Sequence, residues 1–98
     1  MGDVMQVSSS ASLETDRAQY TIGRVTARSP WRSADRELAE SDREIALRAL
    51  VREAEEYGAD GVVEVAYAVE DCAGGECQGV KLHRFVVTGR AVRLALAA

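Results

Sequence analysis

The segment richest in reactive side chains is residues 71–77. It holds both cysteines of the chain, Cys72 and Cys77, with Asp71 and Glu76 beside them. Two thiolates and two carboxylates are suitable ligands for a soft metal such as zinc or copper(I). One interpretation of the segment is therefore a metal site made of Cys72, Cys77, Asp71 and Glu76.

The same two cysteines allow two other states. Gly74 and Gly75 favour a hairpin turn between them, which would place Cys72 opposite Cys77. Facing strand positions have Cα atoms about 4.5–5.5 Å apart, which is within disulfide range. The sequence thus leaves open a metal site, a disulfide and free thiols in a loop. It indicates no cofactor other than such a metal.

The single histidine, His83, is a poor candidate for the same site. On a continuous strand it would lie about 20 Å beyond Cys77, too far for one metal ion. We interpret it as a partly buried or interface imidazole that makes one hydrogen bond. No Ser-His-Asp or Cys-His set, and no Walker or GxGxxG loop, stands in a recognisable context. The sequence therefore predicts that the protein is not an enzyme.

Alternating apolar and polar residues predict three main strands, over residues 20–29, 62–70 and 80–94. Residues 4–7 form a fourth, short candidate, and residues 71–79 are the expected hairpin loop. On the strand over residues 62–70, Val63, Val65 and Tyr67 should share one face. In the last strand, Gly89 indicates a bulge or a close backbone approach.

A helix is predicted over residues 34–57, with Ser33 as its N-cap in preference to Ser41. Gly58 stands where a left-handed C-cap belongs, and Trp31 is expected to cover the start of the helix. The predicted apolar stripe consists of Leu38, Ala46, Ala49, Leu50, Ala54 and Tyr57. The order of elements predicts an α+β fold of β-α-β-β type, with one long helix on a mostly antiparallel sheet. We expect a single domain over residues 1–98, of which residues 1–19 form a partly flexible N-terminal arm.

The composition predicts a thin core and an assembly of several copies. The chain is 47% hydrophobic, but sixteen of its 98 residues are alanine and only 5% are aromatic. Leu47 and Val51 lie beside the main helical stripe, one turn apart, and the last strand carries apolar residues on both faces. We therefore expect an oligomer interface that includes Leu47, Val51, Leu82 and Val86.

Charge and hydropathy narrow the expected partners. A net charge of −4 argues against nucleic acid, and no apolar run approaches the about 20 residues that a membrane helix needs. We expect neither nucleic acid nor membrane as a partner. Two cysteines, without a lipidation motif or a secretory leader, favour the reducing cytoplasm.

Three stretches of the chain resemble the YbjQ-like family. They are residues 5–14 with Gly23-Arg24-Val25-Thr26, the helix end running into Gly58-Ala59-Asp60-Gly61-Val62-Val63, and Val87-Thr88-Gly89-Arg90-Ala91-Val92. The resemblance implies a dodecin-like β-α-β-β subunit, a ring that is typically a pentamer, and a suggested heavy-metal-binding role. The family's Gly- and Arg-rich stretch before the helix is replaced here by residues 29–33, so no role of that stretch is carried over.

The function predicted from the sequence is a non-enzymatic, ring-forming homo-oligomer of unknown physiological role. The alternative is a metal- or redox-responsive binding protein acting through Cys72 and Cys77.

Overall fold

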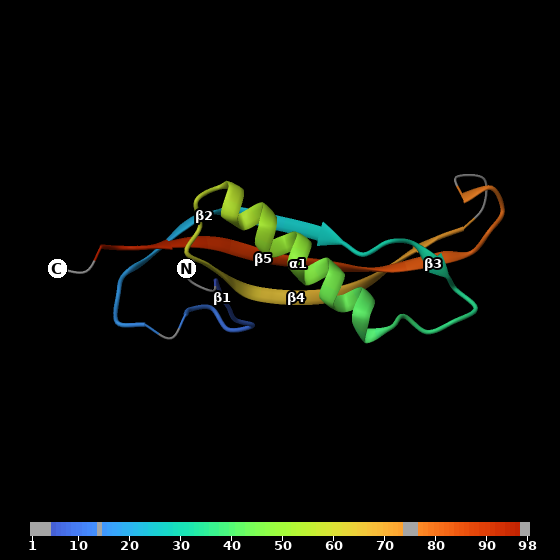
Figure 1. Ribbon diagram of the computed structural model, residues 1–98, viewed down its shortest axis with the longest axis horizontal. Coiled ribbons are helices and arrows are strands. Elements are labelled where there is room, and N and C mark those ends of the chain that lie inside the picture. Colours follow the sequence, from blue (N-terminus) through green and yellow to red (C-terminus); the bar gives the residue numbers. More distant parts are fainter. Residues whose placement is uncertain (1–4, 14, 74–76, 97–98) are drawn as a thin grey trace.

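One helix packs on one face of a mostly antiparallel sheet (Figure 1). The computed structural model describes residues 5–13, 15–73 and 77–96. The elements are β1 (Gln6–Val7), β2 (Gln19–Arg28), β3 (Arg32–Ser33), α1 (Glu40–Glu56), β4 (Gly61–Cys72) and β5 (Leu82–Leu94). The predicted α+β fold is confirmed, and β1 and β3 are two short strands beside the β-α-β-β order.

β5 is the central strand of the sheet. The strand order is β1-β4-β5-β2, and β3 pairs with β5 beyond the end of β2. β5 is antiparallel to both β2 and β4, whereas β1 is parallel to β4. It follows that β2 and β4 run in the same direction on the two sides of β5.

The helix starts later than the sequence predicts. It begins at Glu40, and its N-cap is Ala39, which makes no side-chain capping hydrogen bond. The prediction of Ser33 as N-cap is wrong because Arg32 and Ser33 extend the sheet, opposite His83 and Leu82 of β5. The N–H of Ala34 also donates to the carbonyl of Lys81, so the chain is still bound to the sheet where the first helical turn was expected.

The end of the helix is as predicted. Gly58 has a φ of 75°, the left-handed conformation that costs glycine little. Its N–H donates to the carbonyl of Glu55 at 2.9 Å, and the N–H of Ala59 donates to the carbonyl of Ala54 at 3.1 Å. These two bonds form a Schellman motif, which satisfies carbonyls that the helix end would otherwise leave unpaired.

The helix buries one narrow stripe against the sheet. Ala46, Leu50 and Ala54, each four residues apart, are fully buried against β2, β4 and β5. Ala49 and Tyr57, which were predicted to belong to this stripe, are exposed. We call the other side of the sheet, which α1 does not cover, the open face. A second, smaller cluster lies there, and it consists of Leu13, Val63 and Val92 with Leu94 beside them.

A bulge in β4 moves side chains between the two faces. The register of β4 against β5 shifts between Val63 and Ala66, and Glu64 has a φ of 55°. Val62 therefore packs on the helix side, as do Val65 and Tyr67, whereas Val63 joins the open-face cluster. The prediction that Val63 shares a face with Val65 and Tyr67 is wrong, because the bulge breaks the alternation between residues 63 and 65.

The molecule is long and thin. Its principal extents are 57 × 23 × 22 Å, and its radius of gyration is 15.9 Å. A compact chain of this length has a radius of gyration of about 13 Å. Within the N-terminal arm, β1 lies beside β4 and Leu13 is buried, while the flexibility of the arm stays a prediction. So thin a subunit keeps much of its apolar surface near solvent.

Candidate functional site

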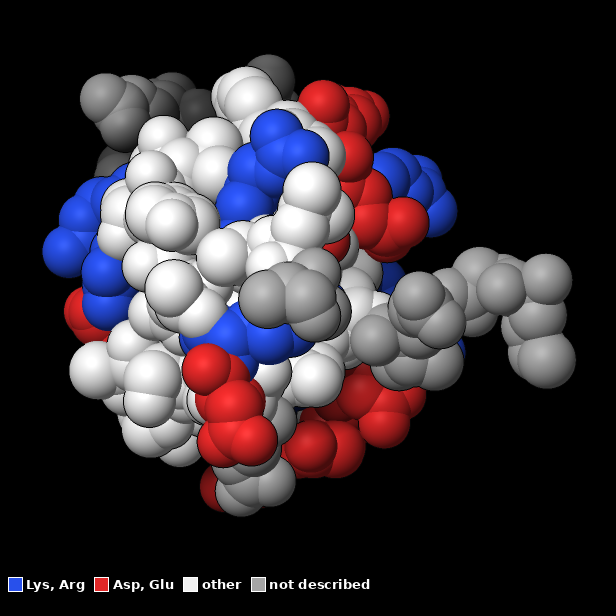
Figure 2. Space-filling model, turned by 90° about the vertical axis from the view of Figure 1, so that its left-hand side faces the viewer, with Lys and Arg blue, Asp and Glu red and all other residues white. Residues whose placement is uncertain are grey.

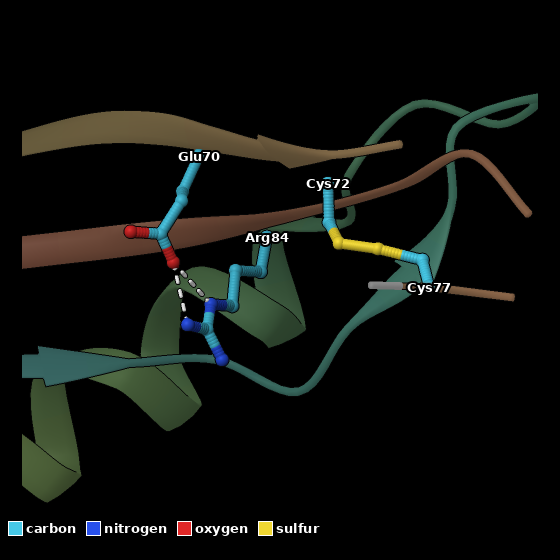
Figure 3. Close-up of a disulfide and its surroundings, with 4 residues drawn as sticks. All are labelled: Glu70, Cys72, Cys77 and Arg84. Atoms are coloured by element: carbon cyan, nitrogen blue, oxygen red, sulfur yellow. Dashed lines mark hydrogen bonds and ion pairs between the residues drawn. A yellow bond between two sulfur atoms is a disulfide. The ribbon is translucent and has the colours of Figure 1, made fainter. Parts of the chain in front are cut away.

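The two cysteines form a disulfide where β4 ends (Figure 3). Cys72 is the last residue of β4, and its Cα lies 6.3 Å from that of Cys77, inside the usual range. The predicted turn geometry is wrong, because Cys72 pairs with Leu82 and Cys77 lies in the connecting loop. The bridge therefore joins the end of a strand to its own loop and does not link two facing strand positions.

The structure separates the predicted metal ligands. Asp71 pairs with His83 and faces the helix side, whereas Cys72 lies with Glu70 on the open face. Successive strand residues point to opposite faces, so Asp71 and Cys72 do not converge. Glu76 lies outside the described residues. In the ranges that the structure does describe, no three His, Cys, Asp or Glu residues are grouped to hold a metal ion. A metal site at Cys72, Cys77, Asp71 and Glu76 stays a prediction.

A charged cluster that the sequence analysis missed occupies the open face beside the disulfide. Both Nε and Nη2 of Arg84 contact Oε1 of Glu70, and Nε of Arg28 lies 3.5 Å from the same oxygen. The guanidinium of Arg84 also stacks on the ring of Trp31, 3.8 Å from its centre. Figure 3 shows Glu70, Arg84 and Cys72 pointing to the same side of the β4–β5 pair. We call Glu70, Arg84, Arg28 and Trp31 the Glu70 cluster.

The Glu70 cluster joins three parts of the chain. Glu70 and Arg84 are directly opposite in the β4–β5 ladder, and Arg28 ends β2 on the far side of β5. The hydrogen bond from Arg84 lowers the pKa of Glu70, the charges of Arg84 and Arg28 add to this, and partial desolvation opposes it. The prediction that Trp31 covers the start of the helix is wrong, because its ring packs on Arg84 instead. Glu70 and Arg84 carry opposite charges and lie equally far in sequence before and after residue 77. This symmetry about the hairpin loop was the one sequence signal that could have indicated their pairing.

His83 is half-buried, as predicted, but the hydrogen bond expected of its imidazole is not found among the described residues. Its Nε2 atom is buried and has no hydrogen-bond partner among the described residues. In the described ranges, no hydrogen bond joins this imidazole to a serine, threonine or cysteine side chain.

The predicted oligomer interface divides between the two faces of the subunit. Leu47 packs against the helix-side core and stays partly exposed, and Val51 is half-buried on the same flank of α1. Leu82 and Val86 are half-buried on the open face. The four residues cannot form one continuous patch on a single subunit, so their role as an interface stays a prediction.

Several large apolar side chains remain exposed. They include Tyr20 and Ile22 on β2, Ile45 and Tyr57 at α1, and Val69 on β4. Figure 2 shows the end of the molecule where β2 begins and α1 ends, and uncharged residues make up much of this surface. At this end, Ile22 and Tyr57 line a shallow pocket of about 230 Å³ together with Arg24 and Ala91. Ile22 and Tyr57 therefore form a small apolar group at this end, which is a candidate contact surface.

The profile of the YbjQ-like family, described as "Putative heavy-metal-binding", matches residues 32–95, about two thirds of the chain. The chain belongs to the YbjQ-like family. The resemblance seen in the sequence is thereby confirmed. The family is one of unknown function, and no enzymatic activity is indicated for it. No helix in the described part of this YbjQ-like protein has the length and hydropathy needed to cross a bilayer.

A solved structure shows the same fold. It is the crystal structure of a protein of unknown function from the DUF74 family of Pediococcus pentosaceus ATCC 25745, which is the same family. The match has a TM-score of 0.65 at 15% sequence identity and covers 93% of this chain and 98% of that one. At this identity the likeness establishes the fold alone. No curated protein matches the sequence.

Proposed function

We propose that this YbjQ-like protein is a non-enzymatic module that assembles into a ring of identical subunits, most simply a pentamer. The observation that carries the proposal is the apolar surface left open on a thin, elongated subunit. The number five rests on the family resemblance. Homo-oligomers with closed cyclic symmetry are a common solution for a subunit that cannot cover its own apolar surface.

The core supports this proposal because it is small. Leu50 is the largest fully buried side chain, and the other large ones are Val25, Val62, Val63, Val87 and Val92. Apolar side chains of the same sizes lie outside it, with Ile22 38% exposed and Val69 53% exposed. Burying such side chains stabilises a protein by about 1.5–3 kcal/mol each. A neighbouring copy offers that burial, whereas a lone subunit does not.

The assembly is tested by sedimentation velocity and native mass spectrometry of the unmutated chain at tens of micromolar. We expect a single closed oligomer of five copies, and a compact monomer would overturn the proposal. The double variant Leu47→Glu, Val51→Glu should dissociate the ring while leaving the circular dichroism spectrum in place. Arg48→Glu is the matched control, because it makes the same change in net charge on the exposed side of α1.

A redox-responsive role is the second candidate, and the disulfide favours it. We place the protein in the cytoplasm, where glutathione keeps most thiols reduced. There the bridge between Cys72 and Cys77 would form on oxidation, when two thiols give two electrons and two protons to a peroxide or a disulfide. Once reduced, the same thiolates become available to a soft metal, which the bridged form cannot bind.

Native mass spectrometry separates the two arms of this second candidate. The reduced chain and the oxidised chain are each measured with and without zinc, alongside the control Cys72→Ser, Cys77→Ser. Zinc retained only by the reduced, unmutated chain would support metal binding. A change of assembly state on oxidation alone would support the redox arm. If the four spectra and the control agree, neither arm stands. Partners other than the chain itself, including nucleic acid and membranes, are not part of the proposal, because the net charge of −4 disfavours polyanions.

A further inference from the structure

The sheet has two unpaired margins, formed by β2 on one side and by part of β4 on the other. The strand order ends at β2, so its outer edge has no neighbouring strand among the described residues. On the other side, the N-terminal arm covers β4 only at residues 61–65. There the N–H groups of Glu64 and Val65 donate to the carbonyls of Ser10 and Ser8. Residues 66–72 of β4 therefore form a second free margin.

The hydrogen bonds of β5 show which backbone groups point outward from these margins. The N–H of Ser29 donates to the carbonyl of Phe85. The backbone N–H and C=O groups of odd-numbered residues of β5 therefore point toward β2. The N–H of Asp60 donates to the carbonyl of Val92, so even-numbered residues point toward β4. In an antiparallel ladder, two facing residues either exchange both hydrogen bonds or direct both groups away from each other.

Each margin consequently presents alternate residues with outward N–H and C=O groups. The residues that pair with odd-numbered positions of β5 are Tyr67, Val69 and Asp71 on β4. The residues that pair with even-numbered positions are Arg24, Thr26 and Arg28 on β2 after its register shift, and Gln19 and Thr21 before it. These backbone groups have no hydrogen-bond partner within the described residues. In a parallel ladder, alternate residues of each strand direct their N–H and C=O groups to the other strand, and the two margins have this arrangement.

We propose that β2 of one copy pairs in parallel with residues 66–72 of β4 in the next copy. This pairing rests on the proposed ring and names the contact that closes it. β2 and β4 run in the same direction within a subunit, because both are antiparallel to β5. Rotation about an axis parallel to the strands preserves that direction, so each β2 meets a neighbouring β4 in parallel. Such a head-to-tail contact closes into a ring when the rotation between successive copies adds up to a full turn.

The arm sets the stagger between neighbouring copies. Within one subunit, Arg24 of β2 is level with Arg90 of β5 and Val63 of β4. Since the arm covers residues 61–65, the incoming β2 has to pair further along β4. A sheet that closes on itself requires a stagger of this kind.

Charge favours the head-to-tail contact over a two-fold one. A two-fold contact between β2 margins would bring Arg24 and Arg28 of one copy close to the same arginines of the other, for example Arg24 opposite Arg28. A two-fold contact between β4 margins would do the same for Glu70 and Asp71. Like charges on facing strands destabilise a sheet, and opposite charges stabilise it. The head-to-tail contact avoids both like-charge contacts and places Arg24 and Arg28 on the same face of the sheet as Glu70 of the neighbouring β4, which Arg28 and Arg84 of its own subunit also contact, whereas Asp71 lies on the helix side.

The side chains along the two margins also fit this contact. On the open face, Ala66 and Ala68 of β4 are small and leave room for the arginines of a neighbouring β2. Val69 lies at the β4 margin and Ile22 at the β2 margin, and both are more than one third exposed. Pairing of the margins would remove part of this apolar surface from water, which favours the contact.

Proline provides the test, because it removes a single N–H. Thr26→Pro and Val69→Pro each block one margin, and neither removes a hydrogen bond of the internal ladder, since both N–H groups point outward. Thr26→Val and Val69→Thr are the matched controls, which exchange isosteric side chains and keep the N–H. We expect both proline variants to be monomers with an unchanged circular dichroism spectrum, and both controls to assemble. If a proline variant fails to fold, Arg24→Pro and Asp71→Pro block the same margins.

Mixing the two proline variants tests the direction of pairing. Each variant keeps one usable margin, so the equimolar mixture should give dimers with one copy of each in native mass spectrometry. Dissociation of only one proline variant would indicate a two-fold contact and overturn the proposal, as would a mixture that stays monomeric. A ring that survives both prolines leaves the proposed function standing and overturns the pairing alone. A monomeric unmutated chain overturns the proposed function itself.

Discussion

Arg32 binds one carboxylate oxygen of Asp42 through two nitrogens, Nε at 3.1 Å and Nη2 at 2.9 Å. The contact joins β3 to the first turn of α1. The side chain of Asp42 is only 7% exposed, whereas that of Arg32 is 50% exposed. Among the described residues, Arg32 is therefore the only side chain that forms an ion pair with the nearly buried carboxylate of Asp42.

Arg32→Ala should lower the free energy of unfolding by about 1–3 kcal/mol, because it leaves Asp42 desolvated without its partner. Arg36→Ala is the control, since Arg36 is exposed and makes no side-chain contact with Asp42. Urea unfolding with a constant slope measures the difference. Equal midpoints for the two variants would show that Asp42 does not depend on Arg32.

Gly58 should be required for its backbone conformation. Its φ is 75°, and a Cβ built there meets nothing within 4 Å, so any cost of substitution is conformational. Gly58→Val should lower the free energy of unfolding by roughly 1–2 kcal/mol or more, since a β-branched residue is poor in the left-handed region. Gly58→Asn should cost much less. Urea midpoints that are the same for both variants would contradict this account.

Gly89 should be required for space. A Cβ at this position would lie 2.5 Å from Cγ1 of Val62 and 3.3 Å from the carbonyl oxygen of Val63. Gly89→Ala should therefore destabilise the fold by about 1–3 kcal/mol through overpacking. Gly23→Ala on β2 is the control, because a Cβ there meets nothing within 4 Å. Thermal melting that ranks the two variants equally would show that β4 moves aside without cost.

The sequence predicts the parts of the fold that depend on local chemistry. Gly58 marks the end of the helix, since few residues other than glycine take its φ easily. Gly89 indicates a close approach, which the bulge at Glu64 explains. The bulge itself carries no sequence signal, because its positive φ falls on a glutamate and not on a glycine. The bulge at Glu64 places Val63 on the open face, whereas strict alternation places it with Val65 on the helix side.

Contacts between segments that lie far apart in the sequence could not be predicted from local sequence patterns. Ser33 has the side chain of a good N-cap, but its pairing with β5 overrides that preference. Trp31 and Arg84 are more than fifty residues apart, and only the sheet brings them together. The reactive side chains of residues 71–77 were recognised from their types. Their placement depends on strand alternation, which sends Asp71 and Cys72 to opposite faces.

The disulfide should be dispensable for the fold. Neither cysteine belongs to the two core clusters, and the bridge closes a loop with a sequence separation of five. A loop this short stabilises a protein by about 2 kcal/mol on the chain-entropy estimate. Cys72→Ser, Cys77→Ser should therefore keep its circular dichroism spectrum and lose at most that amount, measured by urea unfolding. Aggregation of the double variant would show that the loop is structural.

Glu70 should make the stability sensitive to acid. The hydrogen bond from Arg84 and the charges of Arg84 and Arg28 lower its pKa in the folded protein from the ordinary value of 4.5. The contribution of Glu70 to the free energy of unfolding is fully present above the ordinary pKa of glutamate, where Glu70 is ionised in both the folded and the unfolded state. As the pH falls, the unfolded chain takes up the proton first, so stability is lost progressively until the pH passes below the folded pKa.

Glu70→Gln should remove this part of the pH dependence. The unmutated chain and the variant are compared by urea midpoints over a pH series that runs from neutral to below the ordinary pKa of glutamate. We expect the gap between them to be largest near neutral pH and to narrow as the pH falls, because protonation of Glu70 weakens its contacts with both arginines. Glu55→Gln is the control, since Glu55 is exposed on α1 and makes no ion pair among the described residues. A gap that stays constant with pH would show that Glu70 contributes packing alone and that its charge does not stabilise the fold.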